Sequence, residues 1–302
     1  MKIVITGTNG AVGRAILRRE QMDGASSVTY VAAVRSRRAA EDIRSQLGQS
    51  DEIVSISYDD PRSLDIALRG AAAVIHLAGI LVERSDSTYE HANVESTRSV
   101  VESAKRAAVQ KMLLVSAIGA DESSSNRYYH TKGEAETLVR TSGLCYTVLR
   151  VPRLLGCGTA GAKALQRFVS TGRARLIGGG RHLEQPLDVR DVAKAAVQIA
   201  TRPSLTSNVT LDLVGPECLP EWGLVERAAR LAGREVRISS IPKGFLSLVL
   251  AVRERVSSPG FSRDALDVIL ADTRLDPKPA ARELGVQLTG IDDMIKDSLG
   301  LK

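Results

Sequence analysis

Three polar side chains in this sequence have the types and spacing that proton transfer to a carbonyl group requires. Tyr128 and Lys132 are four residues apart, so a helix would place them on one face. There the ammonium is expected to lower the pKa of the phenol from its usual value of about 10. Such a phenol can donate a proton to a carbonyl oxygen, or remove one from an alcohol, while hydride moves from or to a nicotinamide. Ser116, which precedes Tyr128 by twelve residues, would orient the same oxygen.

The spacing Tyr-x-x-x-Lys alone is weak evidence for catalysis, because it is common by chance and in surface pairs. The sequence around this pair makes the evidence stronger. Residues 2–5, 28–34, 53–58, 72–77 and 111–116 read as strands, and helical patterns separate them, including a long helix over 89–107. This alternation requires a parallel sheet with helices on both faces. Ligands of such sheets lie beyond the carboxyl ends of the strands, where Ser116 ends the fifth strand.

The first strand leads into a glycine-rich turn and a helix, the order that binds a dinucleotide. Gly7, Gly10 and Gly13 follow the strand at three-residue spacing. Glycine tolerates the positive φ of a tight turn, lets the backbone approach a pyrophosphate and lets the helix pack closely. The N–H groups and the positive dipole end of the helix would face the phosphates. The residues of this turn predicted to bind the cofactor are Thr6, Gly7, Asn9, Gly10, Ala11, Val12 and Gly13.

The loop after the second strand selects between the two nicotinamide cofactors. An acidic residue there would bind the ribose 2′-hydroxyl of NAD(H), whereas arginine accommodates the 2′-phosphate of NADP(H). Residues 30–40 contain no acidic residue but include Arg35, Arg37 and Arg38. The sequence therefore favours NADP(H) over NAD(H), with Arg35 as the phosphate partner.

Two further strand ends complete the predicted cofactor site. Asp59 and Asp60 follow the third strand, where carboxylates usually lie beside the adenine, although Asp60 with Pro61 could equally start a helix. The small residues that end the fourth strand would let the ribose and nicotinamide pass over it. His76, inside that strand, reads as a packed histidine. The residues predicted at the end of the fourth strand are Leu77, Ala78 and Gly79.

Composition excludes several classes of protein. Of 302 residues, 43% are hydrophobic and only 3% aromatic, too few for a nucleic-acid platform that stacks bases. Three separated cysteines offer neither a disulfide framework nor metal-ligand spacing, so no metal site is predicted. The first strand begins at Lys2 and the longest apolar run, 245–252, is too short to cross a bilayer. We therefore expect a cytoplasmic protein without a transmembrane segment.

Several motifs together resemble the short-chain dehydrogenase/reductase superfamily, in its atypical and extended branches. They span about two thirds of the chain, and the closest similarity is to the NmrA-like group and to the nucleotide-binding accessory subunit of respiratory complex I. The motifs are Thr6-Gly7-x-x-Gly10-x-x-Gly13, His76-Leu-Ala-Gly79, Asn93-Val-Glu-Ser-Thr97, Leu114-Val-Ser116, Tyr128-x-x-x-Lys132, Ser142-Gly143, Tyr146-Thr-Val-Leu-Arg150-Val-Pro152 and Pro186-Leu-Asp188-Val-Arg-Asp191-Val-Ala193.

The resemblance assigns further roles. It implies that Ser116, Tyr128 and Lys132 are catalytic, that Lys132 also holds the nicotinamide ribose, and that Asn93 supports Lys132 through water. Some NmrA-like relatives bind NADP(H) only as sensors or structural subunits, so this alternative stays open, as does a weaker one, an epimerase or dehydratase. The segment implied to pass beside the nicotinamide amide is Val151, Pro152 and Arg153.

The resemblance also implies a small C-terminal substrate lobe on the Rossmann-type doubly wound sheet. The Rossmann core is expected over 1–155, with 186–214 returning to the sheet, and the lobe over 156–185 and 215–302. The substrate is an unidentified small molecule. The apolar helix that includes 245–252 is a candidate contact for a protein partner or a second copy of the chain. The large side chains that could line the lobe, or simply pack within it, are Phe168, Trp222, Phe245, Leu248 and Phe261.

Overall fold

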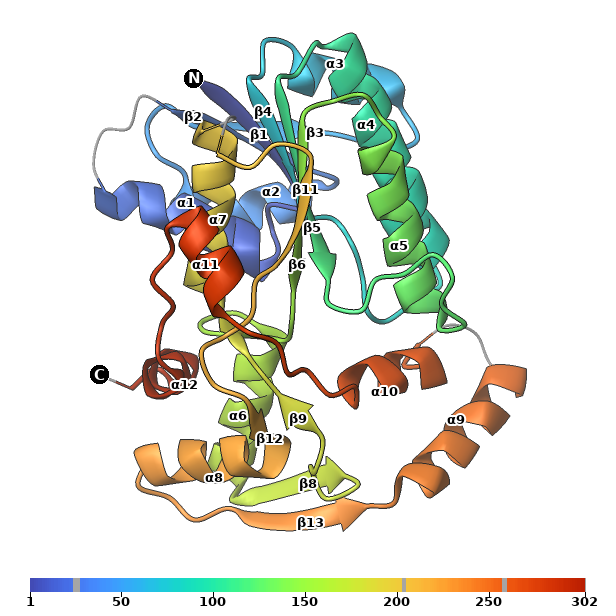
Figure 1. Cartoon of the computed structure of the whole chain (residues 1–302), viewed down its shortest axis with the longest axis vertical. Coiled ribbons are helices and arrows are strands. Elements are labelled where there is room, and N and C mark those ends of the chain that lie inside the picture. Colours follow the sequence, from blue (N-terminus) through green and yellow to red (C-terminus); the bar gives the residue numbers. More distant parts are fainter. Residues whose placement is uncertain (24–27, 203–204, 257–259, 302) are drawn as a thin grey trace.

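A sheet of seven parallel strands forms the centre of the protein, in the order β11-β6-β5-β4-β1-β2-β3 (Figure 1). The computed structural model describes residues 1–23, 28–202, 205–256 and 260–301. The predicted Rossmann-type doubly wound fold is confirmed. The strands are β1 (Lys2–Thr6), β2 (Thr29–Val34), β3 (Glu52–Ser55), β4 (Ala73–His76), β5 (Lys111–Ala117), β6 (Tyr146–Val151) and β11 (Val209–Asp212).

Helices cover both faces of this sheet, because successive strand residues point to opposite sides. Ile3 and Ile5 of β1 pack into one apolar layer, and Val4 between them packs into the other. The first layer contains α1 (Ala11–Asp23), α2 (Arg37–Ile43), the short 3₁₀ helix η1 (Arg44–Gln46) and α7 (Val189–Thr201). The second contains α3 (Pro61–Leu68), α4 (Ser96–Arg106) and α5 (Arg127–Arg140).

A third, smaller apolar cluster forms a lobe beyond the carboxyl edge of the sheet (Figure 1). Its strands β8 (Arg173–Ile177) and β13 (Arg237–Ile241) pair in parallel. Two further short strand pairs are β7 (Leu154–Leu155) with β10 (Leu187–Asp188), and β9 (Leu183–Glu184) with β12 (Leu219–Pro220). The helices of the lobe are α6 (Ala160–Thr171), α8 (Glu221–Leu231) and α12 (Ile291–Leu299).

Segments of the second half of the chain alternate between the main sheet and the lobe. Among the described residues of 186–214, β11 joins the main sheet, whereas β10 pairs with β7 outside it. Within 215–302, α11 (Lys278–Leu284) returns to the core, where Ala280 and Leu284 pack in the layer of α1 and α7. α10 (Arg263–Ile269) packs against α5. Sequence periodicity could not show these returns, since they depend on contacts between distant segments.

The helix expected over 89–107 is not one regular helix. Residues Glu90–Glu95 form a π-helix, η2, and α4 starts at Ser96. Ala92, Asn93 and Val94 of this segment are all buried. Such π segments are frequent at functional sites.

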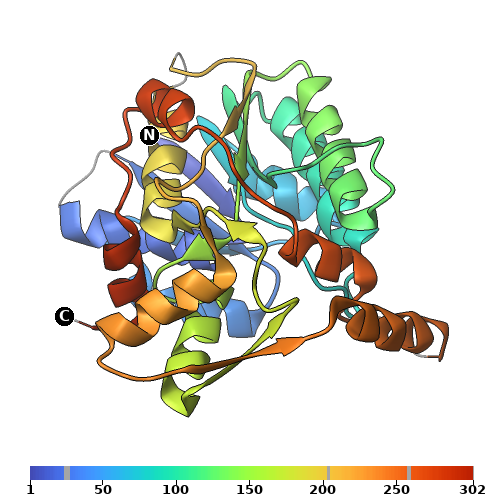
Figure 2. The same ribbon diagram turned by 60° about the horizontal axis from the view of Figure 1, so that its bottom comes forward.

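Helix α9 (Lys243–Val256) projects from the body of the protein (Figure 2). Phe245 and Leu248 are each 64% exposed, and Val249 and Val252 are also exposed. By contrast, Phe168 packs against the apolar cluster of the lobe. A partner for α9 stays a prediction. Among the described helices, none has the length and apolar character needed to cross a bilayer.

Substitution of Gly133 by alanine is expected to destabilise the fold by about 1–3 kcal/mol, since overpacked cores lose free energy of this size. The loop before α5 crosses this helix at Gly133, and a Cβ atom there would overlap the backbone of Asp121 and Glu122. Urea unfolding measures the loss. Gly244→Ala is the matched control because it lies in a helix with open space around it, and it should gain up to about 1 kcal/mol. Equal effects at both positions would contradict the packing described.

Candidate functional site

The turn after β1 has the geometry that glycine makes possible. Gly7 has a φ of +74°, and its carbonyl accepts a hydrogen bond of 3.0 Å from the Gly10 N–H. A Cβ atom on Gly13 would lie 2.7 Å from the carbonyl carbon of Thr8, so the first turn of α1 packs on the loop itself. Asn9 and Gly10 are exposed at the tip. The turn therefore fits a pyrophosphate, which α1 would bind with the free N–H groups of its first turn.

The turns after β1 and β4 lie against each other at the carboxyl edge of the sheet. A Cβ atom on Gly7 would be 3.0 Å from both the Leu77 carbonyl carbon and the Ala78 nitrogen. The Leu77 N–H donates a 3.1 Å hydrogen bond to the Thr6 carbonyl. The structure thus brings together the predicted residues of these two strand ends, with backbone contacts that side chains would prevent.

Arg35 and the residues after β3 meet at a second corner of this edge. The Arg35 guanidinium is exposed and lies 5.8 Å from the centroid of the Tyr58 ring, within cation–π range. Asp59 and Asp60 follow and are exposed. Asp60 caps α3 by accepting a 3.1 Å hydrogen bond from the Arg62 N–H, so it has the helix-starting role that the sequence left open.

Ser116 and Lys132 are both buried at the end of β5. Ser116 is 3% exposed, and its Oγ atom has no hydrogen-bond partner among the residues that the structure describes. Lys132 is 5% exposed, and its Nζ atom donates to the Val115 carbonyl at 3.2 Å. Burial lowers the pKa of Lys132 to about 8, against the opposing charge of Glu136. At the end of β5, a hydroxyl without a hydrogen-bond partner therefore lies with an amine whose pKa is lowered. Both groups are suited to binding an oxygen atom of a ligand.

Tyr128 lies at the start of α5, where Asn126 accepts hydrogen bonds from the N–H groups of Tyr128 and Tyr129. Its ring contacts that of Tyr89 at 5.8 Å between centroids, while the Tyr129 ring packs over Gly119. The prediction that Lys132 lowers the pKa of Tyr128 is wrong. Burial raises this pKa, and Tyr129 and Tyr89 add to the increase.

Asn93 connects the residues around Lys132. Its Oδ1 atom accepts a 3.3 Å hydrogen bond from the Ile80 N–H, and its Nδ2 atom donates to Thr131 at 3.1 Å. A Cβ atom on Gly79 would lie 3.0 Å from the Asn93 Oδ1 atom and 3.5 Å from the Lys132 Nζ atom. Gly79, Asn93 and Lys132 are therefore neighbours. Thr131 was not singled out from the sequence, which carries no signal for this contact.

Val151 and Pro152 are partly buried at the end of β6, but Arg153 points to the lobe. Its guanidinium pairs closely with Glu184 and lies 3.5 Å from Glu221. The His182 Nε2–H group donates to the Glu184 carboxylate at 3.1 Å. Burial lowers the pKa of His182, but this carboxylate outweighs it, so the pKa is raised. The ligand-type atoms of His182, Glu184 and Glu221 lie within 4.8 Å of one another, but Arg153 already supplies their counter-charge. Sequence analysis missed this cluster because its members are distant in the chain.

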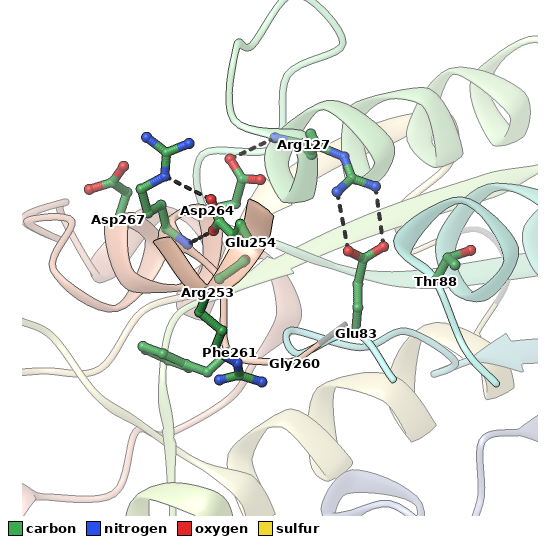
Figure 3. Close-up of a pocket in the computed structure, with 11 residues that line it drawn as sticks. Glu83, Thr88, Arg127, Arg253, Glu254, Gly260, Phe261, Asp264 and Asp267 are labelled. Atoms are coloured by element: carbon green, nitrogen blue, oxygen red, sulfur yellow. Dashed lines mark hydrogen bonds and ion pairs between the residues drawn. The ribbon is translucent and has the colours of Figure 1, made fainter. Parts of the chain in front are cut away.

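A pocket of about 640 Å³ lies between the loop after β4, the start of α5, and helices α9 and α10 (Figure 3). Arg127 binds Glu83 through two guanidinium nitrogens, at 3.2 and 3.3 Å, and its N–H donates to Asp264. The Arg127 guanidinium also lies 5.7 Å from the Tyr89 ring centroid. Through Tyr89, this charged pocket adjoins Tyr128.

The glycine turn, the buried Lys132 and the sheet order define a Rossmann-type dinucleotide-binding protein. A family model described as NAD(P)H-binding matches residues 7–203, and the chain belongs to this family. The predicted resemblance to the NmrA-like group is confirmed. Binding of NAD(P)H is thus a property of the family to which the chain belongs.

The similarity extends to proteins with different roles. A ceramide reductase of Caulobacter vibrioides is 25% identical over 80% of this chain and 73% of its own length. The 40 kDa subunit of NADH-ubiquinone oxidoreductase from Neurospora crassa is 23% identical over 94% and 74%. The structure of UDP-glucuronic acid 4-epimerase from Bacillus cereus aligns with a TM-score of 0.76 at 16% identity, over 99% and 98% of the two chains, which supports the fold alone.

His76 should make the free energy of unfolding depend on pH. It is fully buried between Thr6, at 2.6 Å, and Thr97, at 3.1 Å, as the sequence predicted for a packed histidine. Burial and the charge of Lys132 lower its pKa to about 3. The unfolded chain, with a pKa near 6.5, therefore binds the extra proton first as the pH falls.

The stabilisation of the folded state that depends on neutral His76 is complete above about pH 6.5, and it is lost as the pH falls towards 3. At pH 5 the expected loss is about 2 kcal/mol relative to pH 7.5. Urea unfolding at both pH values measures it. His76→Asn should show a smaller difference between the two pH values, and an unchanged difference would refute the assignment.

Proposed function

We propose that the protein is an NADP(H)-dependent oxidoreductase that interconverts a small carbonyl compound and an alcohol. The observation that carries the proposal is the Ser116 hydroxyl, which is buried at the carboxyl end of β5 without a hydrogen-bond partner among the described residues. A carbonyl oxygen would provide that partner. The cofactor supplies or accepts the hydride.

Each residue then has a defined task. The Ser116 hydroxyl donates to the carbonyl oxygen and fixes its position, and Tyr128 transfers its phenolic proton to that oxygen as negative charge develops there. Lys132, one helical turn further along α5, would hold the nicotinamide ribose with its ammonium group. In alcohol oxidation the same groups act in reverse. The raised pKa keeps Tyr128 protonated, which is the form from which carbonyl reduction starts, although it also makes the phenol a weaker acid.

A second function is supported by a specific observation. The relative from the respiratory NADH-ubiquinone oxidoreductase matches 94% of this chain, and it is named as a subunit. The corresponding proposal is a protein that holds NADP(H) as a structural or sensory ligand and binds a partner. The exposed apolar face of α9 suits such contact. The reductase name of the Caulobacter relative favours the first function.

Tyr128→Phe should lower kcat for NADPH-dependent carbonyl reduction by about 10²–10⁴-fold, the usual contribution of a general acid. The affinity for NADPH, measured by fluorescence titration, should stay within about threefold. Tyr129→Phe is the matched control and should keep most of the activity, because its ring packs on Gly119. Short- and long-chain aldehydes and ketones form the substrate panel. If no member oxidises NADPH and the cofactor copurifies without exchange, the structural function replaces the enzymatic one.

Arg35→Ala should weaken NADPH binding by about 1.5–3 kcal/mol, the range for a hydrogen bond to a charged group, and leave NADH binding nearly unchanged. The arginine would bind the 2′-phosphate, which NADH lacks. Isothermal titration with both cofactors measures the difference. Arg37→Ala is the control, since Arg37 is exposed and already pairs with Glu41 at 3.1 Å. Equal losses for NADPH and NADH would exclude Arg35 as the phosphate partner.

A further inference from the structure

Glu136 is a buried carboxylate that the proposed reaction does not use. Its side chain is completely inaccessible to solvent, one helical turn beyond Lys132 on α5. It accepts hydrogen bonds from Arg150 at 2.8 and 2.6 Å, one on each oxygen, and from Arg140 at 2.9 Å. Both carboxylate oxygens of Glu136 are therefore held by guanidinium donors, which offset its burial.

Arg150 links this carboxylate to β5, the strand that contains Ser116. In the sheet, Arg150 of β6 is the register partner of Ser116, and its Nη2 atom also donates to the Ala120 carbonyl at 2.9 Å. A buried ion pair of this kind rarely stabilises a protein more than apolar residues of the same volume. The location of Glu136, between the catalytic helix and the end of β5, therefore suggests a use other than stability.

The groups closest to the Lys132 ammonium are uncharged. Its Nζ atom donates to the Val115 carbonyl, and Gly79 and the neutral amide of Asn93 adjoin it. His76 on β4 is held neutral by burial, with a pKa of about 3. Among the charged groups described around Lys132, Glu136 is the one that raises the pKa of this lysine, in opposition to burial.

We propose that Glu136 is a positioning residue that acts through Lys132: its fixed negative charge keeps Lys132 an ammonium inside the site, and Arg140 and Arg150 hold that charge in place. Helical geometry places residues four apart on one face, so the charge acts along α5. The consequence for turnover rests on the proposed function, but the ionisation of Lys132 does not.

The ionisation of Lys132 can be observed without any substrate. In protein labelled with ¹³C at the lysine Cε position, the resonance assigned by its loss in Lys132→Met is followed by NMR as a function of pH. Its midpoint should be near 8 in the wild type. In Glu136→Gln the midpoint should fall by about one pH unit or more, as expected when a neighbouring opposite charge is removed and two arginines are left uncompensated.

Two matched variants separate charge from packing. Glu136→Asp keeps the charge and should keep the midpoint within a few tenths of a unit, whereas Arg140→Gln keeps Glu136 and should not lower the midpoint. If Glu136→Gln does not fold, the double variant Glu136→Leu with Arg150→Leu replaces the ion pair by apolar residues and should also lower the midpoint. An unchanged midpoint in the folded Gln or double-Leu variant overturns the proposal.

The kinetic consequence provides a second readout. If the ammonium is required, activity is lost as the pH rises through the pKa of Lys132, so the basic limb of the kcat/KM profile should move to lower pH in Glu136→Gln by the same shift as the resonance. A purely structural role would lower activity at all pH values without moving this limb. A shifted resonance in a protein that turns over no carbonyl would refute the enzymatic function and leave the role of Glu136 intact.

Discussion

Removal of water from the end of β5 is the constraint on which the rest of the site depends. Lys132 and Tyr128 respond to it in opposite directions, because each loses its charged form: the pKa of the lysine falls and that of the tyrosine rises. Burial thus favours the neutral form of each group, whereas the spacing alone suggested a charged pair. The Val115 carbonyl and the Glu136 carboxylate counteract this effect at Lys132.

The features that sequence analysis predicted depend on short stretches of chain. Gly7 and Gly13 were identified because a tight strand-to-helix turn excludes side chains at those positions, and the structure shows the close backbone contacts responsible. The parallel sheet with helices on both faces follows from the alternation of strands and helices. Ser116 was placed correctly at the end of β5 for the same reason. These are local or topological rules, which a single sequence contains.

The features that it missed depend on distant or cooperative contacts. The π-helix around Asn93 inserts an extra residue into a turn, and no propensity scale distinguishes it from an α-helix. The partners of Arg153 come from residues about 30 and 70 positions further along the chain, so nothing near Arg153 indicates its direction. The pKa of Tyr128 was predicted with the wrong sign because spacing reports a neighbouring charge but not the loss of solvent.

The return of α11 to the core has a consequence for how the two parts of the molecule can move. The chain leaves the sheet after β6, comes back at α7, leaves again after β11 and comes back at α11 before α12 enters the lobe. The lobe is therefore tethered to the sheet by several covalent connections. A swing of the lobe as a rigid body would have to bend all of them together, and a truncation that removed it would also strip Ala280 and Leu284 from the layer beneath α7.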